Sequence, residues 1–374
     1  MQVAIVAGEP SGDRLGAGLV RELRRRYPQL KVEGIGGPGM EDAGCHLLYD
    51  MDRIGVMGLD GLSEKLRDIL AIRRDLTQRW SSNPPDVFVG VDVPDFNLGL
   101  EVRMRRRSVP CVHYVSPTVW AWRGYRIHKI RRAVSHLLAL FPFEEAYYQK
   151  HGVEVTCVGH PMADEIGEPN PHAARQTLDL AGEPIVALLP GSRRSEVSRL
   201  AEPLVGAARR LLDRYPGIRF VLPFASPGVR QVFEEVSGDT SDLPLTILQG
   251  NARLALEAAD VAVLASGTAS LEAALLRVPH VVVYRLSAFS YWLMRRQRQV
   301  DHFAMPNHLL PEPMVPELIQ HAATPDNIVD AVCAYLQNPH RMQVLRSEFA
   351  ALHNDLHRDA DSLAADVVAT YLVR

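Results

Sequence analysis

Two glycine-containing segments in the second half of the chain have the residue types that bind phosphate. The first is Leu188-Leu-Pro-Gly-Ser-Arg193, which follows an apolar run and precedes an amphipathic one. Gly191 lets the backbone approach a ligand closely, a helix amino terminus offers free N–H groups, and Arg193 adds a charged donor. We predict that Gly191, Ser192 and Arg193 bind a diphosphate. A tight turn with a solvated arginine is the alternative, and the segment lacks the Gly-Lys-Ser/Thr ending of a Walker A loop.

The second segment is Ala265-Ser-Gly-Thr-Ala-Ser-Leu-Glu272, which also lies between an apolar run and a helical pattern. Ser266, Gly267 and Thr268 offer hydroxyl and backbone donors to phosphate, and Glu272 can accept hydrogen bonds from ribose hydroxyls. Small residues and an acidic side chain also favour the start of a helix without any ligand. Two such segments in one domain predict a site for a nucleoside diphosphate.

Polar and acidic residues follow the first predicted strand, in Gly8-Glu-Pro-Ser-Gly-Asp13. This segment is neither GxGxxG nor a P-loop, which argues against a dehydrogenase. We predict that Glu9 and Ser11 bind a sugar. In the alternative interpretation, Ser11 caps a helix and Asp13 interacts with the dipole of that helix.

A second acidic segment is Asp86-Val-Phe-Val-Gly-Val-Asp-Val-Pro-Asp-Phe-Asn97, in which Asp92 and Asp95 follow a buried strand. A carboxylate there can act as general base toward a hydroxyl, as an inverting glycosyl transfer requires. The Asp-x-x-Asp spacing does not predict a metal site, and no other cofactor is indicated. A helix cap is the alternative role for these residues.

Aromatic and basic residues alternate in His113-Tyr-Val-Ser-Pro-Thr-Val-Trp-Ala-Trp-Arg123, and residues 124–132 continue with cations and no acid. Trp120, Trp122 and Arg123 suit a phospholipid interface or an acylated phosphate substrate. A second segment, residues 291–298, has a similar composition. Core tryptophans and a solvated charged face are the alternative interpretation.

Short apolar runs alternate with helical patterns along the whole chain, which predicts two doubly wound α/β domains facing each other across a cleft. Helices are expected at residues 14–27 and 62–76, with a turn at 8–13. Breaks at 167–184 mark the domain boundary. We expect domains at 1–167 and 168–340 and a helical tail at 341–374. The predicted strands are residues 3–7, 32–35, 87–91, 111–115, 137–140, 185–189, 220–222, 245–248, 261–264 and 281–284.

Composition excludes several classes of protein. The net charge of −3 gives no global attraction to nucleic acid or anionic lipid, so electrostatic targeting must be local. The four cysteines are far apart and form no metal or disulfide pattern. No apolar run is long enough to cross a bilayer, and the first residues do not have the pattern of a signal peptide. We expect a protein that is soluble or peripheral on a membrane.

These segments together resemble the lipid-A-disaccharide synthase family, in its order and from residue 8 to residue 307. The resemblance also includes Phe141-Pro-Phe-Glu144, Gly159-His-Pro-Met-Ala-Asp164 and Pro306-Asn307. It implies a GT-B fold and metal-independent, inverting transfer of 2,3-diacylglucosamine from UDP to 2,3-diacylglucosamine 1-phosphate. The product is a β-1,6-linked disaccharide 1-phosphate of lipid A. The reaction would take place on the cytoplasmic face of a Gram-negative inner membrane, and the enzyme would be a homodimer with exchanged C-terminal parts.

By the same resemblance, Asp95 is the expected general base, and Glu9, Ser11 and Asp86 shape the acceptor side. Arg193 and Asn307 serve the UDP side or domain closure. The chain departs from the family pattern at Pro10 and His308. Two other functions stay open: another UDP-sugar enzyme, such as a UDP-N-acetylglucosamine 2-epimerase, and a non-catalytic nucleotide-sugar sensor.

Overall fold

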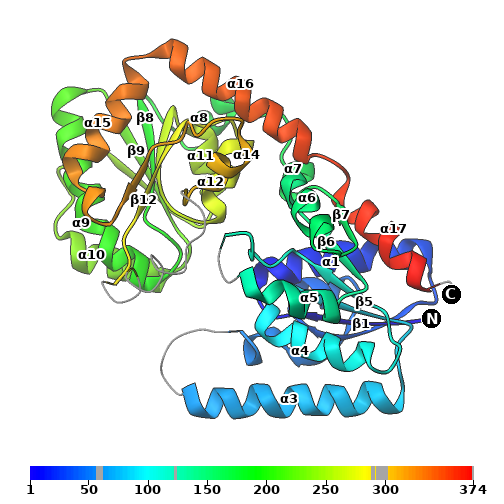
Figure 1. Cartoon of the computed structure of the whole chain (residues 1–374). Coiled ribbons are helices and arrows are strands. Elements are labelled where there is room, and N and C mark those ends of the chain that lie inside the picture. Colours follow the sequence, from blue (N-terminus) through cyan, green and yellow to red (C-terminus); the bar gives the residue numbers. More distant parts are fainter. Residues whose placement is uncertain (56–61, 122–123, 288–290, 292–301, 373–374) are drawn as a thin grey trace. The chain divides into compact units, whose positions relative to one another are not determined.

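The structure is a computed structural model that describes residues 1–55, 62–121, 124–287, 291 and 302–372 (Figure 1). The chain forms two compact units. Unit 1 contains Met1–Asp164 and Leu356–Arg374, and unit 2 contains Glu165–Asp355. Each unit is built on its own parallel sheet with helices on both faces, so the prediction of two doubly wound α/β domains is confirmed. The assignment of acceptor and donor binding to residues 1–167 and 168–340 stays a prediction.

Unit 1 has a seven-stranded sheet in the order β3-β2-β1-β4-β5-β6-β7, and all of its strand pairs are parallel. The central strands carry the continuous apolar runs expected of strands covered on both faces. The strands are β1 (Gln2–Ala7), β2 (Lys31–Gly36), β3 (His46–Asp50), β4 (Val87–Val91), β5 (Cys111–Tyr114), β6 (His136–Ala139) and β7 (Val155–Cys157).

The helices of unit 1 connect consecutive strands, as parallel pairing requires. They are α1 (Pro10–Arg26), α2 (Pro38–Asp42), η1 (Met51–Arg53), α3 (Leu62–Ser82), α4 (Pro94–Arg105), η2 (Gly124–Arg126), α5 (Ile127–Ala133), α6 (Pro142–Lys150) and α7 (Pro161–Glu165). The C-terminal helix α17 (Ala360–Leu372) packs against α1 in the same unit (Figure 1).

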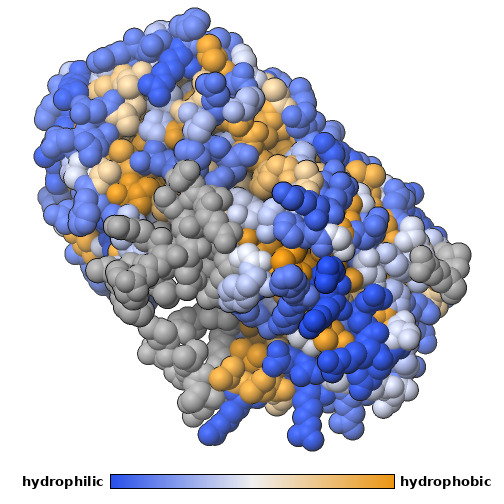
Figure 2. Space-filling view, in the orientation of Figure 1, coloured by the Kyte–Doolittle hydropathy of each residue, from blue (hydrophilic) through white to orange (hydrophobic). Residues whose placement is uncertain are grey.

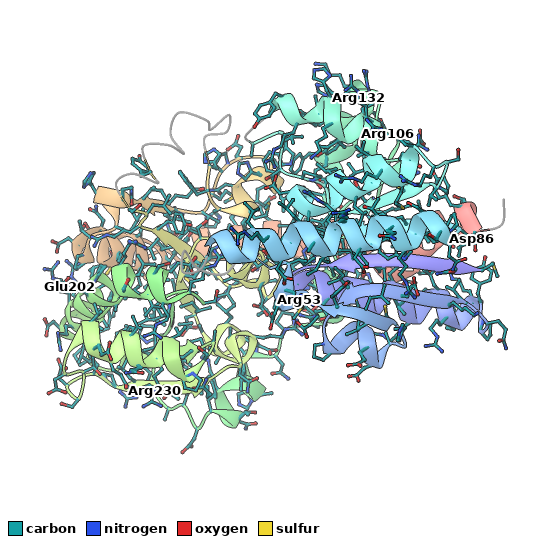
Figure 3. All side chains as sticks on the ribbon, turned by 90° about the horizontal axis from the view of Figure 1, so that it is seen from below. Arg53, Asp86, Arg106, Arg132, Glu202 and Arg230 are labelled. Atoms are coloured by element: carbon teal, nitrogen blue, oxygen red, sulfur yellow. The ribbon has the colours of Figure 1, made fainter. Side chains whose placement is uncertain are left out.

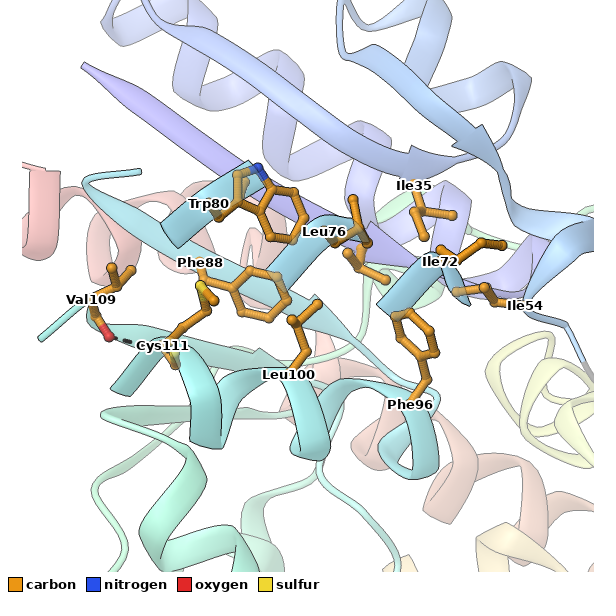
Figure 4. Close-up of a cluster of buried hydrophobic side chains, with 13 residues drawn as sticks. Ile35, Ile54, Ile72, Leu76, Trp80, Phe88, Phe96, Leu100, Val109 and Cys111 are labelled. Carbon is orange, nitrogen blue, oxygen red and sulfur yellow. Dashed lines mark hydrogen bonds between the residues drawn. The ribbon is translucent and has the colours of Figure 1, made fainter. Parts of the chain in front are cut away.

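A cluster of buried side chains fixes α3 and α4 on the sheet of unit 1 (Figure 4). Trp80 of α3 lies 5.5 Å from Phe88 of β4, measured between ring centroids, and both side chains are fully buried. Leu100 of α4 and Leu76 of α3 belong to the same cluster. Burial of each such side chain contributes about 1.5–3 kcal/mol. The cluster therefore holds the start of α4, where Asp95 lies, in a fixed position on the sheet.

Unit 2 repeats this plan with a six-stranded parallel sheet in the order β10-β9-β8-β11-β12-β13. The strands are β8 (Ile185–Leu189), β9 (Arg219–Phe224), β10 (Leu245–Gln249), β11 (Val261–Ala265), β12 (His280–Tyr284) and β13 (Glu317–Ile319). The helices are α8 (Pro171–Thr177), α9 (Arg194–Arg214), α10 (Pro227–Ser237), α11 (Ala252–Ala258), α12 (Thr268–Leu275), α14 (Met305–Leu309), η3 (Gln320–Ala322), α15 (Pro325–Leu336) and α16 (Pro339–Leu356).

Both sheets reverse their strand order next to their first strand. This switch point lies between β1 and β4 in unit 1 and between β8 and β11 in unit 2. Ligands of open α/β sheets bind beyond the carboxyl ends of the strands at such a point. The predicted sugar and phosphate segments follow these four strands directly.

Every predicted strand is present in the structure. The structure also contains three strands that were not predicted, and one helix begins earlier than expected. Strands β3, β7 and β13 were missed; each lies at a sheet edge, where residues stay partly exposed and apolar runs are not required. Helix α1 begins at Pro10 rather than at residue 14, with proline at a position that suits the first helical turn. Residues 10–13 are therefore helical, and not part of a turn.

The C-terminal tail is held on unit 1 by Asp164. Its Oδ1 accepts hydrogen bonds from the N–H groups of Arg358 and Asp359 at 2.9 and 3.0 Å, and its Oδ2 accepts from Ala360 at 2.7 Å. These donors lie at the start of α17, which the carboxylate therefore caps. Gly159 (φ +81°) allows the chain before α17 to approach closely, because a Cβ atom there would lie 2.5 Å from the Leu356 carbonyl oxygen.

Candidate active site

The two phosphate-type loops line a single cavity in unit 2. The cavity has a volume of about 460 Å³ and lies beyond the carboxyl ends of β8 and β11. That volume is in the range of sites for small molecules and cofactors. All seven residues predicted from these loops line it: Gly191, Ser192, Arg193, Ser266, Gly267, Thr268 and Glu272.

The first loop is shaped by Gly191 and Glu196. Gly191 has φ +113°, and a Cβ atom there would lie 2.6 Å from Glu196 Oε2, so a side chain is excluded. Glu196 accepts a hydrogen bond from the Arg193 N–H at 3.3 Å, and its Oε1 lies 3.3 Å from Arg193 Nη1. The Arg193 side chain is nevertheless 73% exposed, which leaves its guanidinium accessible to an anion at the amino terminus of α9.

The second loop starts α12 at Gly267, which has φ +148°. Ser266 Oγ donates to the Phe303 carbonyl oxygen at 3.1 Å, which ties the loop to the segment before α14. Glu272 lies one turn into α12, and its Oε1 is 3.4 Å from Arg253 Nε. The cavity therefore combines backbone N–H groups, a guanidinium and a carboxylate, the set that a nucleoside diphosphate requires.

Sequence reasoning missed a further part of the cavity wall. Residues at the ends of β9 and β10 complete the lining, namely Pro223, Phe224, Ala225, Gly250, Asn251 and Ala252. Asn251 has the left-handed conformation (φ +53°), in which asparagine is more frequent than other non-glycine residues. The available signal was the position of these residues directly after two predicted strands.

Asn307 does not line the cavity. Its side chain is 6% exposed, and its amide is fully engaged inside the fold. Nδ2 donates to the Val315 carbonyl oxygen and to Glu317 Oε1 at 2.8 and 2.7 Å, and Oδ1 accepts from two backbone N–H groups. Glu317 also accepts from the N–H of Phe303, the residue that receives the Ser266 hydroxyl. The geometry therefore favours an indirect role for Asn307, through the 302–317 segment.

In unit 1, the two acidic turns meet at the switch point. A Cβ atom on Gly8 would lie 2.9 Å from a Val93 methyl group, so the β1–α1 and β4–α4 turns are in contact. Glu9, Ser11 and Asp95 are exposed on these turns. Ser11 lies inside the first turn of α1, and the N-cap position belongs to Glu9, whose side chain makes no cap hydrogen bond. Glu9 and Ser11 thus remain accessible to a ligand.

Asp95 lies in the first turn of α4 and forms an ion pair that the sequence did not predict. Its Oδ1 is 2.6 Å from Nη2 of Arg126 in η2, with Asp95 76% and Arg126 18% exposed. The more buried arginine fixes the orientation of a carboxylate that is open to solvent. Such a carboxylate can accept a proton from a bound hydroxyl.

The β4–α4 turn is strained, and Asn97 holds it. Asp92 and Val93 have φ +51° and +42°, a conformation that is a genuine outlier for a β-branched residue. The buried Asn97 Nδ2 donates to the Val6, Val91 and Asp92 carbonyl oxygens, at 3.2, 3.3 and 2.8 Å. Residues in such conformations cost about 1–3 kcal/mol each and occur where function requires a defined backbone. Asn97 is therefore a brace of the turn rather than a helix cap.

A buried ion pair lies beside this turn. His113 Nδ1 of β5 is 2.6 Å from Glu101 Oε1 of α4, and neither side chain is exposed. Burial opposes the charged form of His113, but the Glu101 and Asp92 carboxylates outweigh it and raise the pKa of the imidazole. A Cβ atom on Gly90 would lie 2.3 Å from Glu101 Oε1, so glycine is required where β4 passes the pair.

Glu144 positions the tryptophan-containing segment. Its buried Oε1 accepts from Trp120 Nε1 at 3.1 Å and from the Ser116 hydroxyl, and its Oε2 accepts from the Phe141 N–H at 3.2 Å. Burial raises the pKa of Glu144 to about 6 despite these hydrogen bonds. Trp120 is thus fixed by its indole N–H, whereas the predicted residues Trp122 and Arg123 lie outside the described residues. Most of the similar 291–298 segment lies outside them as well.

Asp86 is placed away from the other predicted acceptor residues. It precedes β4, at the opposite end of the strand from Asp92, and its Oδ2 accepts from the Gln2 N–H at 2.6 Å. Arg53 lies in η1, which follows the carboxyl end of β3, and Figure 3 shows it well away from Asp86. A five-residue strand spans about 16 Å, too far for direct contact with a ligand at Asp95. In the structure Asp86 joins the starts of β1 and β4, which favours an indirect contribution to the acceptor side, and its assignment to that side stays a prediction.

Neither a membrane-spanning helix nor a metal-binding cluster occurs among the described residues. No helix there is long and apolar enough to cross a membrane. Within the same residues, no group of three or more His, Cys, Asp or Glu side chains is arranged to hold a metal ion.

Solved structures define the fold class. The chain resembles the glycosyltransferase of kitacinnamycin (TM-score 0.64, 16% identity, 99% of each chain). It also resembles MurG from Acinetobacter baumannii (TM-score 0.59, 15% identity, 99% of each chain). The UDP-GlcNAc 2-epimerase of Neisseria meningitidis, solved with UDP-GlcNAc, has a TM-score of 0.63 at 14% identity over the whole of both chains. The architecture is therefore that of the GT-B fold.

Sequence comparison identifies the family within that class. The family model of lipid-A-disaccharide synthetase matches residues 3–368. The lipid-A-disaccharide synthase of Alkalilimnicola ehrlichii is 49% identical over 374 residues, covering 98% of each chain. That of Saccharophagus degradans is 46% identical over 99% of this chain and 97% of its own. The chain belongs to the lipid-A-disaccharide synthase family, and it is a glycosyltransferase of lipid A biosynthesis.

Proposed function

We propose that the cavity of unit 2 binds the UDP portion of the donor, UDP-2,3-diacylglucosamine. The observation that carries this assignment is the presence of both phosphate-type loops on the wall of one cavity at the switch point. Gly191, Arg193 and Gly267 would hold the diphosphate through backbone N–H groups and the guanidinium. Glu272 would accept hydrogen bonds from the ribose, and the residues at the ends of β9 and β10 would surround the base.

Asp95 is the proposed general base toward the acceptor, 2,3-diacylglucosamine 1-phosphate. The 6-hydroxyl of the acceptor loses its proton to the Asp95 carboxylate while its oxygen bonds to C1 of the donor sugar. The bond from C1 to the phosphate oxygen breaks, and UDP leaves with inversion at C1. The role is supported by the exposure of Asp95, its place after β4 and its orientation by Arg126. Glu9 and Ser11 on the adjoining turn would bind the acceptor sugar.

We propose that the enzyme works at the cytoplasmic face of the inner membrane; its two substrates carry acyl chains and are therefore held at a membrane surface. Trp120 and the basic helix α5 in unit 1 support this placement. We also propose a homodimer with exchanged C-terminal parts. Support comes from the two C-terminal helices: α16 belongs largely to unit 2, whereas α17 packs on α1 of unit 1. In the proposed dimer, the link between them places α17 of one protomer on unit 1 of the other. Analytical ultracentrifugation tests the dimer; a monomer at micromolar concentration would contradict it.

The donor assignment is tested by calorimetric titration with UDP, followed by mass spectrometry of the product formed from both lipid substrates. Saturable UDP binding and a disaccharide phosphate are expected. Ser266→Trp is designed to block the cavity. If this variant folds, forms the disaccharide and binds UDP as well as the parent protein does, the assignment of the cavity is refuted.

A further inference from the structure

Ser266 lines the cavity of unit 2 with both of its hydrogen-bond donors already used. Its backbone N–H donates to the Val283 carbonyl oxygen of β12 at 3.3 Å, and its hydroxyl donates to the Phe303 carbonyl oxygen at 3.1 Å. A serine has one O–H donor and one backbone N–H, and a carbonyl oxygen can only accept. Toward the cavity, Ser266 therefore offers only the lone pairs of its hydroxyl oxygen.

This arrangement distinguishes Ser266 from the two residues that follow it. Phosphate oxygens accept hydrogen bonds, so they require N–H or O–H groups of the protein. The first N–H groups of α12, next to Gly267 and Thr268, have no acceptor inside their own helix and can supply these hydrogen bonds. An oxygen that only accepts suits an O–H or N–H group of the ligand instead. In a nucleoside diphosphate, such groups belong to the ribose and the base.

The carboxylate of Glu317 holds the backbone that accepts the Ser266 proton. Glu317 is the first residue of β13, and its side chain is 11% exposed. Its Oε2 accepts from the Phe303 N–H at 2.8 Å, and its Oε1 accepts from the Ala304 N–H at 3.0 Å and from Asn307 Nδ2 at 2.7 Å. Hydrogen bonds to a charged acceptor are stronger than those between neutral groups. Glu317 therefore anchors the start of this segment to the sheet.

The peptide group between Phe303 and Ala304 connects this anchor to the cavity. Its carbonyl oxygen accepts the Ser266 proton, and its N–H donates to Glu317 Oε1. Because a peptide group is planar, fixing its N–H also fixes the direction of the carbonyl on the opposite side. Both ends of this connection rest on neighbouring strands: Ser266 is bonded to β12, and Glu317 belongs to β13, which pairs with β12.

We propose that Glu317 is a positioning residue for the nucleotide of the sugar donor. It orients the peptide group that takes the Ser266 proton, so that Ser266 accepts a hydrogen bond from the nucleoside and makes none to the phosphates. Glu317 is not among the described residues that line the cavity, so it acts through Ser266. The proposal rests on the proposed binding of UDP in this cavity and adds which part of UDP Ser266 recognises. It differs from the sequence-based expectation, in which the Ser266 hydroxyl donates to phosphate.

The test is calorimetric titration of the full-length protein with UDP and with inorganic pyrophosphate. Ser266→Ala should bind UDP about 3- to 10-fold more weakly than the parent protein, the loss expected for one hydrogen bond, and should bind pyrophosphate equally well. Glu317→Gln should show the same selective loss, because its amide places an NH₂ group where a carboxylate oxygen accepted a hydrogen bond.

Glu312→Gln is the matched control, since it removes the same charge from the same segment. Glu312 is exposed and is not among the described residues that line the cavity. Figure 2 shows that the visible face of unit 2 is largely hydrophilic with small hydrophobic patches, and removing one charge from such a surface usually has little effect on the fold. This variant should bind UDP and pyrophosphate like the parent protein.

A double-mutant cycle distinguishes positioning from a loss of stability. If Glu317 acts through Ser266, adding Glu317→Gln to Ser266→Ala should weaken UDP binding no further, whereas a general loosening of unit 2 would add a second loss. Circular dichroism checks that each variant is folded; if Glu317→Gln does not fold, Ser266→Ala with the two ligands decides. Equal binding of 2′,3′-dideoxy-UDP by Ser266→Ala and the parent protein would assign the hydrogen bond to a ribose hydroxyl, and a remaining loss would assign it to the base.

Equal loss of UDP and pyrophosphate affinity in Ser266→Ala would overturn the proposal, because Ser266 would then bind phosphate. Additive losses in the cycle, or UDP binding like that of the parent protein by both Ser266→Ala and Glu317→Gln, would also overturn it. Arg193→Ala separates these results from a failure of the proposed function. If Arg193→Ala weakens the binding of both ligands while the other two variants have no effect, the cavity assignment stands and the role of Glu317 fails. Absence of UDP binding by the parent protein would contradict both.

Discussion

The carboxylate of Asp95 lies 2.6 Å from the guanidinium of Arg126, across 31 residues of sequence. Arg126 precedes α5 and is mostly buried, whereas Asp95 projects from the first turn of α4 into solvent. The pair joins the acidic turn to the basic segment that follows the tryptophans. These two sequence features, which seemed to have separate roles, therefore meet in one arrangement.

Replacing Arg126 by alanine should reduce kcat by about 10- to 100-fold, because a misplaced catalytic group loses that much. UDP affinity should stay unchanged, since the cavity belongs to unit 2. Arg126→Lys should recover part of the activity, and Arg131→Ala, an exposed change on the adjoining helix α5, is the control. Steady-state kinetics in micelles measure the effect. Full activity of Arg126→Ala would show that the ion pair does not position Asp95.

Arg193→Ala should weaken UDP binding by about 10- to 100-fold, the loss expected for a hydrogen bond to a charged group. Arg194 is an exposed neighbour that does not line the cavity, so Arg194→Ala serves as the matched control. Isothermal titration calorimetry measures both. The diphosphate assignment fails if Arg193→Ala and Arg194→Ala bind UDP with the same affinity as the parent protein.

Asp164→Ala should lower the free energy of unfolding by about 1–2 kcal/mol, because it removes the cap of α17. The C-terminal helix should then become more sensitive to limited proteolysis. The control is Asp366→Ala, also on α17, which removes an exposed ion pair with Arg26 of α1. This change should lower the free energy of unfolding by less than about 1 kcal/mol. Equal protease sensitivity of the two variants would show that Asp164 does not hold the tail.

The buried His280 should make part of the stability dependent on pH. Burial lowers the pKa of His280 to about 4, so the folded state stays neutral while the unfolded chain gains a proton below its pKa of about 6.5. The free energy of unfolding should therefore fall by about 3 kcal/mol as the pH drops from 6.5 to 4, and it should be unaffected by His280 above pH 6.5. Glu144 and Asp361, with pKa values raised to about 6, act in the opposite direction.

Comparison with His280→Asn isolates the effect, since the variant lacks the imidazole but keeps both carboxyl groups. The difference in free energy of unfolding between parent and variant should shrink as the pH falls from 6.5 to 4. Urea denaturation at several pH values measures it. A constant difference would show that His280 titrates alike in the folded and unfolded states.

Features that depend on neighbouring residues in the chain were predictable from sequence. The loops around Gly191 and Gly267 each join one strand to one helix, and parallel strands place both loops at the same sheet edge. Edge strands such as β13 were missed because they are short and partly exposed. The buried strands were found because their apolar runs are continuous.

Contacts between distant segments were not predictable. Nothing in the sequence indicates that Arg126 meets Asp95, that Glu144 holds Trp120, or that Asn97 braces the left-handed turn at Asp92. For Asn307 the sequence predicted a ligand contact, whereas the structure shows its side-chain amide already hydrogen-bonded to backbone groups and Glu317. Its motif is consistent with a structural requirement as well as with ligand binding.

The most direct test of the proposed mechanism is acceptor-dependent UDP release by the parent protein, Asp95→Asn and Asp92→Asn in detergent micelles, with chelator present throughout. Asp95→Asn should release UDP about 10² to 10⁴ times more slowly at unchanged UDP affinity, which is the usual contribution of a general base. Asp92→Asn should lose much less, because asparagine also tolerates the left-handed conformation. Near-normal release by Asp95→Asn, with the loss transferred to Asp92→Asn, would contradict the assignment of the base.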